Sequence, residues 1–299
     1  MGITSSLHSR SENLQGIAAM LLAMAAFVSN DTLVKLASRE LPTGEAIFVR
    51  GMFASLIAAG LVAASYGARA LPVMLSRTVV LRGLADVFAT MLFITALVHM
   101  PIGDANAILQ FTPLAVTAAA ALFLGAPVGW RRWLATLVGL AGVLIIVRPG
   151  AAGFNAYAPL AVLSILFVVA RDLLTRRLGA EVRTLLVVCS SCIMVMLGSL
   201  GLAAFEDWRW PPHLAVLALF GASLGLLAGH YWIIVAMRSG EIAVVAPFRY
   251  SIILWAILSG FLIWGEIPDL GSWGGIAIVT AAGLYTFVRE RRLAQAARS

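Results

Sequence analysis

The chain has 299 residues, of which 61% are hydrophobic and only 12% are charged, and its mean hydropathy is +0.97. Soluble domains are about half apolar and about a quarter charged, so this composition excludes a water-facing globule and predicts a membrane protein. The 2 cysteines, Cys189 and Cys192, are too few for the disulfide framework of a small secreted domain. The net charge is +7, but no basic run reaches five residues, so we expect no nucleic-acid partner.

Ten apolar segments are long enough to cross a bilayer as helices, with Pro, Gly or charged residues between them. The predicted spans are 14–37, 44–66, 78–99, 104–124, 130–147, 156–177, 183–204, 212–236, 243–264 and 271–289. A signal peptide is the alternative for the first segment, because Ala23-Met24-Ala25 resembles a cleavage site. We favour a span, because the positive region is a lone Arg10 and an internal repeat includes this segment.

The Lys and Arg residues at the ends of these spans fall mainly on one side of the membrane. That side carries 15 of the 21, the other side carries Arg39, Arg148 and Arg209, and the remaining three lie within spans. Positive loops stay in the cytoplasm. We therefore expect a multi-pass protein of the cell inner membrane, with both termini cytoplasmic and the lipid bilayer as its surroundings.

The sequence resembles itself when it is shifted by about 140 residues, which indicates an internal repeat. The segment from Asp31 to Lys35 then falls on the segment from Asp172 to Arg176. Further aligned pairs are Gly125 with Gly265, Trp133 with Trp273, Gly142 with Gly283 and Arg148 with Arg289. Each copy holds five spans, and an odd number forces the second copy to cross the membrane in the opposite sense. The predicted fold is an all-α polytopic membrane protein whose ten transmembrane helices form two inverted five-helix repeats.

The predicted organisation is a cytoplasmic N-terminal tail at 1–13, a first repeat at 14–150, a second repeat at 151–289 and a cytoplasmic C-terminal tail at 290–299. Inverted repeats let two similar halves open a central site first to one side and then to the other, which favours a carrier over a scaffold or receptor. The sequence has no G-x-x-x-x-G-K-[ST] phosphate loop, so the energy for transport must come from gradients.

Two segments carry a resemblance to a known family. The interval from Pro113 to Ala126 in the first copy equals the interval from Ile253 to Glu266 in the second. They resemble the proline-to-Gly-Glu pattern that closes the fourth helix of each repeat in the EamA family, although Ala126 and Ile253 depart from it. The resemblance covers nearly the whole chain. It points to the drug/metabolite transporter superfamily, most closely to YddG-type exporters of aromatic amino acids, and implies export through a central cavity.

Charged side chains inside a bilayer are costly, so those within spans are candidate site residues. Asp86 lies roughly 12 Å from the start of the third span, and Arg249 roughly 9 Å from the start of the ninth. Both align with apolar residues of the other repeat, so we rank them first. Asp31 and Lys35 are four residues apart, which predicts a local ion pair. Arg50 is either an interface anchor or a site residue.

A zwitterionic amino acid carries an ammonium and a carboxylate, so a cavity with one acid and one base holds both without burying net charge. We predict that Asp86 or Asp31 binds the ammonium and that Arg249 binds the carboxylate. Polar and aromatic residues near these positions complete the predicted site: Asn30, Asn106, Gln110, His230, Tyr231, Trp232 and Tyr250. His230 is a candidate proton carrier, with a simple hydrogen-bonding role as the alternative.

The expected function is secondary export of small amphipathic metabolites, with aromatic or other neutral amino acids as the first substrates, by a monomer or weak oligomer. Other drugs or metabolites, such as organic cations or nucleotide precursors, are the alternative cargo. A lipid-modifying enzyme is disfavoured, because Asp31 and Asp86 lie near opposite span ends and not in one interfacial cluster. A non-transporting scaffold is the remaining alternative. We expect no catalytic residue, cofactor or metal site, since Cys189 and Cys192 suit buried packing.

Overall fold

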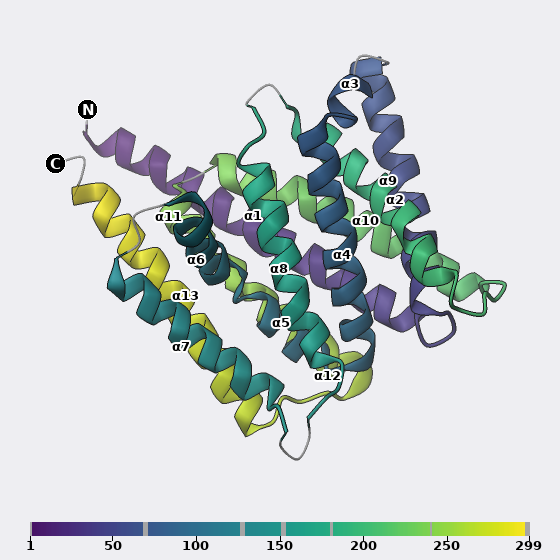
Figure 1. The fold of residues 1–299 in the computed structure, drawn as a ribbon. Helices are drawn as coiled ribbons and strands as arrows, with labels where there is room; N and C mark the ends of the chain where they lie inside the picture. Colours follow the sequence, from purple (N-terminus) through teal and green to yellow (C-terminus); the bar gives the residue numbers. More distant parts are fainter. Residues whose placement is uncertain are drawn as a thin grey trace.

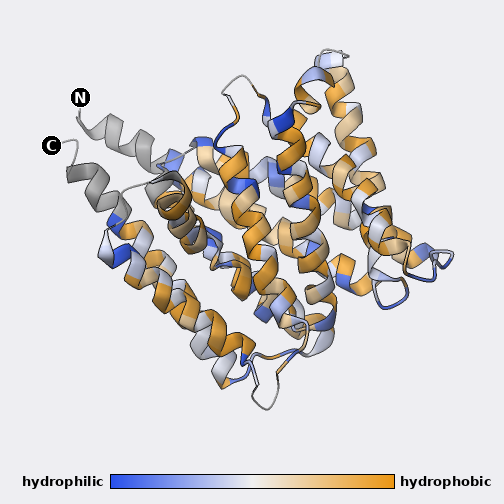
Figure 2. Cartoon of the chain, viewed as in Figure 1, coloured by the Kyte–Doolittle hydropathy of each residue, from blue (hydrophilic) through white to orange (hydrophobic). Residues whose placement is uncertain are grey.

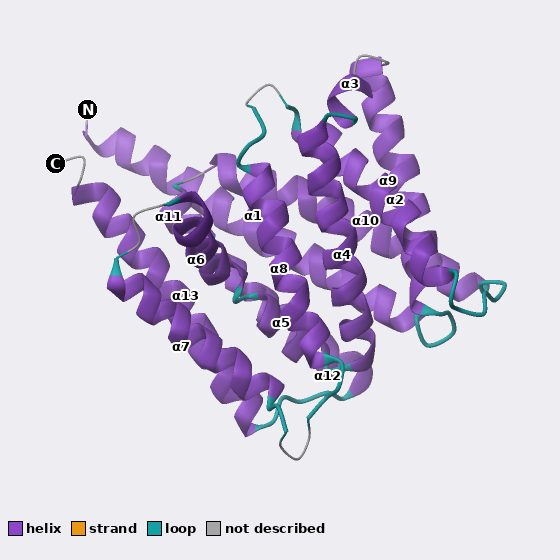
Figure 3. Cartoon of the chain, viewed as in Figure 1, coloured by secondary structure: helices purple, strands orange, loops and turns teal. Residues whose placement is uncertain are grey.

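The structure is a computed structural model that describes residues 2–67, 71–125, 129–150, 154–179, 182–239 and 241–296. Within these ranges all regular structure is helical (Figure 3). Several residues used in the sequence analysis lie outside the described residues: Ala126 of the predicted family pattern, Pro127 and Gly240 between predicted spans, and Arg69 and Arg298, two of the 15 basic residues on the predicted cytoplasmic side. The described parts of the two predicted tails continue the first and last helices, which begin at Gly2 and end at Ala296.

Among the described residues, ten helical segments are long and apolar enough to cross a membrane, and each end lies within three residues of the predicted one. Hydrophobic residues dominate these helices, and hydrophilic ones gather in the loops (Figure 2). The helices are α1 (Gly2–Ala37), α2 (Thr43–Tyr66), α3 (Leu71–Met74), α4 (Arg77–His99), α5 (Ile102–Leu109), α6 (Thr112–Leu124), α7 (Trp130–Val147), α8 (Ala158–Thr175), α9 (Thr184–Ala203), α10 (His213–Ser239), α11 (Ile242–Val245), η2 (Ala246–Tyr250), α12 (Ser251–Trp264) and α13 (Leu270–Ala296).

The fourth span is broken between α5 and α6, which the hydropathy pattern did not predict. Pro113 has no backbone N–H, so the helical hydrogen bond to the Leu109 carbonyl is missing. The Thr112 hydroxyl donates to that carbonyl instead, at 2.6 Å. The ninth span is broken in the same place, because the 3₁₀ turn η2 contains Pro247 and gives way to α12 after Tyr250.

The two broken spans also end alike. The residue that ends α6 is Gly125, with φ of 63°, and the residue that ends α12 is Gly265, with φ of 68°. Both are left-handed conformations that favour glycine over residues with a Cβ. The two glycines are equivalent positions of the sequence repeat, so the backbone repeats with the same period as the sequence.

The helix packing has the two-fold pattern expected of two equivalent halves. Helix α1 packs along α10, and α8, which corresponds to α1 in the second half, packs along α4. Other contacts pair equivalent spans with each other, namely the second with the seventh (α2 with α9), the fourth with the ninth (α5 with α12) and the fifth with the tenth (α7 with α13). In Figure 1 the long helices accordingly lie side by side as a bundle. Because each half contributes five of the ten spans, the halves run through the bundle in opposite senses, which confirms the inverted repeat.

The even number of spans places both termini on one face of the bundle, together with α3, and we call this the terminal face (Figure 1). The loops that follow α1, α4, α7, α9 and α12 form the opposite, distal face. Contacts between the halves cross the distal face. The Asn155 side-chain amide donates to the His99 carbonyl at 2.8 Å. Arg148 donates to Asp269, and this hydrogen bond holds the pKa of the Asp269 carboxyl below its usual value.

Candidate functional site

A cavity of about 140 Å³ lies at the breaks of the fourth and ninth spans, between these spans and helices α1, α8 and α10. It is lined by residues of α1, α5, α6, α8, α10, η2 and α12, so both repeats contribute to it. The lining residues are Met24, Phe27, Leu109, Gln110, Thr112, Val168, Arg171, Ile233, Arg249 and Ile252. The cavity is smaller than the roughly 300 to 1,000 Å³ of drug-sized ligand sites, so a larger cargo requires the halves to move apart.

Arg249 and Gln110, two of the predicted site residues, are brought together at this cavity. The Gln110 side-chain amide donates to the Arg249 carbonyl at 3.4 Å, which joins the break of the fourth span to the break of the ninth. Among the described residues, the Arg249 guanidinium has no ion-pair partner. It therefore lines the cavity without a directly paired carboxylate.

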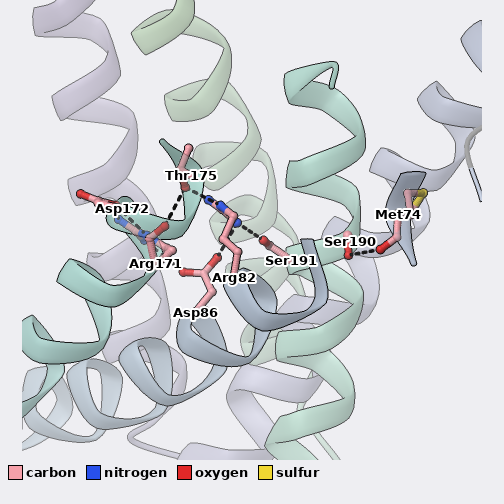
Figure 4. Close-up of polar contacts among 8 residues, drawn as sticks. All are labelled: Met74, Arg82, Asp86, Arg171, Asp172, Thr175, Ser190 and Ser191. Atoms are coloured by element: carbon pink, nitrogen blue, oxygen red, sulfur yellow. Dashed lines mark hydrogen bonds and ion pairs between the residues drawn. The ribbon is translucent and has the colours of Figure 1, made fainter. Parts of the chain in front are cut away.

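A second guanidinium, that of Arg171 on α8, also lines the cavity and connects it to a cluster of charges (Figure 4). Arg171 pairs with Asp86 of α4 at 3.0 Å and with its neighbour Asp172 at 3.0 Å. Arg82 lies 3.6 Å from Asp86, the one-turn pair that their spacing suggests, and donates to Thr175 at 2.9 Å. Asp86, predicted to be a site residue, thus reaches the cavity through Arg171.

The charges around the cavity do not balance. Arg82, Arg171 and Arg249 contribute three positive charges, whereas Asp86 and Asp172 contribute two negative ones. The surplus positive charge is costly in a bilayer unless an anionic group compensates it. Because a guanidinium presents a planar fork of donors, a carboxylate is the matching group.

Asp31 and Asn30, also predicted site residues, lie in a separate buried network on α1. The two oxygens of Asp31 accept from Asn30 at 3.0 Å and from Asn106 of α5 at 3.2 Å. Asn30 in turn accepts from Arg50 of α2 at 3.3 Å. All four side chains are buried, and none of them is among the residues that line the cavity. Within this network the negative charge of Asp31 is balanced by the positive charge of Arg50.

The predicted ion pair between Asp31 and Lys35 is wrong. Lys35 pairs with Glu266, 231 residues away in the other repeat, at 2.7 Å. The four-residue spacing on α1 permits a local pair, but both oxygens of Asp31 are already occupied by asparagine amides. A long-range partner of this kind has no local sequence signal.

None of the predicted aromatic residues, nor His230, is among those that line the cavity. Tyr231 is 61% exposed and contacts Trp232, which packs against the buried residues of α1. The Tyr250 hydroxyl points at Gly283 of α13 and leaves no room there for a Cβ. The His230 ring stands edge-on to Phe27, a lining residue, and its Nδ1 lies 2.8 Å from the Leu226 carbonyl oxygen.

Sequence reasoning missed Arg171, which it counted only among the positive residues near span ends. The repeat held a signal for it. Arg171 precedes Asp172 as Asn30 precedes Asp31, so the register that aligns the two aspartates also places Arg171 on a predicted site residue. Its long-range partner Asp86 comes from the packing of α4 on α8.

Two inverted five-helix repeats around a charged internal cavity are the architecture of a secondary transporter. The model of the EamA-like transporter family matches residues 14–148, the region of the first predicted repeat. The chain belongs to the EamA-like transporter family, within the drug/metabolite transporter superfamily, and is a multi-pass membrane transporter. This confirms the family inferred from the spacing of Pro113 to Ala126 and of Ile253 to Glu266.

Relatives with different cargoes are similar along most of the chain. The S-adenosylmethionine uptake transporter of Rickettsia conorii is 25% identical over 93% of this chain and 94% of its own length. The pseudopaline exporter of Pseudomonas aeruginosa is 29% identical over 89% and 94%. The riboflavin transporter of Vibrio cholerae is 30% identical over 67% of each chain. A crystal structure that covers 92% of this chain and 98% of its own has a TM-score of 0.63 at 18% identity, which supports the fold.

Proposed function

We propose that this protein is an inner-membrane secondary carrier for small metabolites that contain an amino-acid group. In this proposal, repeats 14–150 and 151–289 exchange conformations around the cavity, both termini are cytoplasmic, and no chemical step occurs. The observation that carries the proposal is the unpaired guanidinium of Arg249 in a cavity built by both repeats. An anionic group on the cargo supplies the charge that the described lining lacks.

Arg249 binds the cargo carboxylate, and Gln110 beside it holds the Arg249 backbone in place. The ammonium is assigned to Asp86 in preference to Asp31, because Asp86 is bonded to a lining residue whereas Asp31 is closed off by Asn30 and Asn106. When the ammonium approaches Asp86, Arg171 keeps its second partner, Asp172. The zwitterion adds no net charge to the site, because its carboxylate pairs with Arg249 and its ammonium pairs with Asp86.

Neutral and aromatic amino acids are the first cargo to test, and the proposed direction is export. A zwitterion crosses the membrane without electrical work, whereas a monovalent cation moved outward opposes about 2.3 kcal/mol per 100 mV. The relatives bear names of both uptake and export, so direction is a property to measure on this chain. Their cargoes, S-adenosylmethionine, pseudopaline and riboflavin, belong in the same panel.

The experiment is counterflow of a labelled neutral amino acid in liposomes that contain the purified protein. The competitors are the free acid, its methyl ester, which has no carboxylate, and the amine left by decarboxylation. We expect the free acid to compete and the two derivatives to fail, with the labelled compound recovered unchanged. Equal competition by ester and acid would contradict the carboxylate site, and a chemically altered product would indicate an enzyme.

A further inference from the structure

The ion pair between Lys35 and Glu266 is the centre of a compact polar contact at the distal face. The Lys35 ammonium donates to Glu266 at 2.7 Å and to the Met100 carbonyl at 2.8 Å. The second oxygen of Glu266 accepts from the Ile102 backbone N–H at 3.0 Å. The ammonium also lies 4.9 Å from the centre of the Trp264 ring. We call this group of five residues the distal latch.

The distal latch joins elements that line the cavity. Lys35 belongs to α1, Ile102 begins α5, and Glu266 directly follows the glycine that ends α12. The side chains of Lys35 and Glu266 are 8% and 23% exposed, so water weakens the pair little. As long as the latch is intact, these three elements cannot separate at the distal face.

Among the described residues of the terminal face, no ion pair corresponds to that of Lys35 and Glu266. In the repeat register, Lys35 corresponds to Arg176 at the end of α8, and Glu266 corresponds to position 126. Position 126 is alanine, which has no carboxylate. Arg176 is accordingly exposed and has no ion-pair partner in the part of the chain that the structure describes. The two repeats thus differ at the point where the family pattern is incomplete.

The cavity is also displaced toward the terminal face. Arg171 is four residues from Thr175, the last residue of α8 on that face, which is about 6 Å along the helix. Arg249 lies in the first turn of the ninth span, which begins at the same face. The latch therefore lies near the distal face, and the charged cavity lies nearer to the terminal face.

We propose that the distal latch is a one-sided gate, which holds the resting carrier closed at the distal face and accessible from the terminal face. The inference rests on the proposed alternating-access function. In the opposite state the latch is broken, and the described residues of the terminal face offer no equivalent pair to stabilise its closure. Under the proposed orientation, the resting carrier is thus poised to accept cargo from the cytoplasm.

The test is the labelling rate of a single cysteine in the cavity, which needs no substrate. Leu109→Cys is introduced into a Cys189→Ala/Cys192→Ala background, and a membrane-impermeant thiol reagent is applied to the distal face of intact cells. Glu266→Gln is expected to raise the labelling rate by about tenfold, which is the population shift for the loss of one charge-assisted hydrogen bond.

A second variant separates gating from misfolding. Glu266→Gln leaves Lys35 buried without its partner, whereas Lys35→Met together with Glu266→Gln leaves no buried charge. The double variant is expected to give the same tenfold rise and a monodisperse protein in detergent. If Glu266→Gln alone is unstable, the labelling rate of the double variant tests the gate.

The reverse change introduces the acid that the sequence lacks at the repeat equivalent of Glu266. Ala126→Glu places a carboxylate at the repeat equivalent of Glu266, and Arg176 is the repeat equivalent of Lys35. Labelling of the cavity cysteine from the terminal face, measured in inside-out vesicles, is expected to fall several-fold. Adding Arg176→Ala to Ala126→Glu is expected to restore the native rate, because the new acid then has no partner.

The outcomes separate the gate from the function on which it rests. Equal distal labelling of the native and latch-free proteins, at a measurable rate, would overturn the gate and leave alternating access intact. A cavity cysteine that is never labelled from the distal face in any variant would contradict both the gate and alternating access. A tenfold rise in the latch-free proteins supports both.

Discussion

Replacing Arg249 by glutamine is the change that most directly tests the cargo site. The native guanidinium has no ion-pair partner among the described residues, so its removal leaves no buried acid without its partner. We therefore expect Arg249→Gln to fold and insert normally, with an unfolding midpoint no lower than that of the native protein. Only the binding of cargo that carries a carboxylate should weaken.

The magnitude follows from the contact that is lost. A hydrogen bond to a charged group contributes about 1.5 to 3 kcal/mol, and about 1.4 kcal/mol corresponds to a factor of ten in affinity. The apparent affinity for a neutral amino acid should therefore fall by about 10-fold to 150-fold. Arg249→Lys keeps the charge but not the planar fork of donors, so its loss should be smaller.

The assay is concentration-dependent counterflow in liposomes at matched protein density, with the unfolding midpoint of each variant measured in detergent. The methyl ester of the cargo, which has no carboxylate, is the matched control and should compete equally weakly with the native protein and with the variant. A native affinity for the free acid in Arg249→Gln would refute the assignment of Arg249 to the cargo carboxylate.

Three further changes test the structure around the cavity. Arg171→Gln should lower the stability by about 1 to 3 kcal/mol, in contrast to Arg249→Gln, because Asp86 and Asp172 lose their shared partner; an unchanged unfolding midpoint would contradict the cluster. Gly265→Ala should destabilise by about 1 to 2 kcal/mol because its φ is positive, whereas Gly60→Ala, a helical site with open space, should not; equal midpoints would disprove the left-handed cap. Asp269→Asn should lower the unfolding midpoint at neutral pH and have no effect well below pH 4. The hydrogen bond from Arg148 depresses the pKa of Asp269, so the stabilisation from the carboxylate is lost as the pH falls through that pKa. A difference between variant and native protein that persists in acid would exclude the carboxylate as the source of the stabilisation.

The spans and the repeat could be predicted from the sequence because their causes are local or periodic. Twenty apolar residues have few stable conformations in lipid other than a helix, so hydropathy placed all ten spans. The glycines at 125 and 265 marked equivalent helix ends, and the structure gives both the same left-handed backbone. The breaks in the fourth and ninth spans had a signal in Pro113 and Pro247 that hydropathy does not weigh.

The site could be predicted only in part, because partners depend on packing. Arg249 and Gln110 were found from their depth and polarity, and the structure places both at the cavity. Arg171 was missed because its role depends on α4 lying against α8. Lys35 was paired with the wrong acid because Glu266 reaches it across 231 residues of sequence. The sequence identifies the charged side chains and their spacing, but the tertiary fold decides which of them form ion pairs.

The central claim is that the two halves cross the membrane in opposite senses around the cavity. Equivalent loops of the two repeats must then lie on opposite faces, and the most direct test uses a cysteine at Glu40, after α1, and another at Gly179, after α8. In intact cells an impermeant thiol reagent should label Glu40→Cys, and it should label Gly179→Cys only after the membrane is opened. Labelling of both positions from the same side would contradict the inverted repeat and the carrier mechanism built on it.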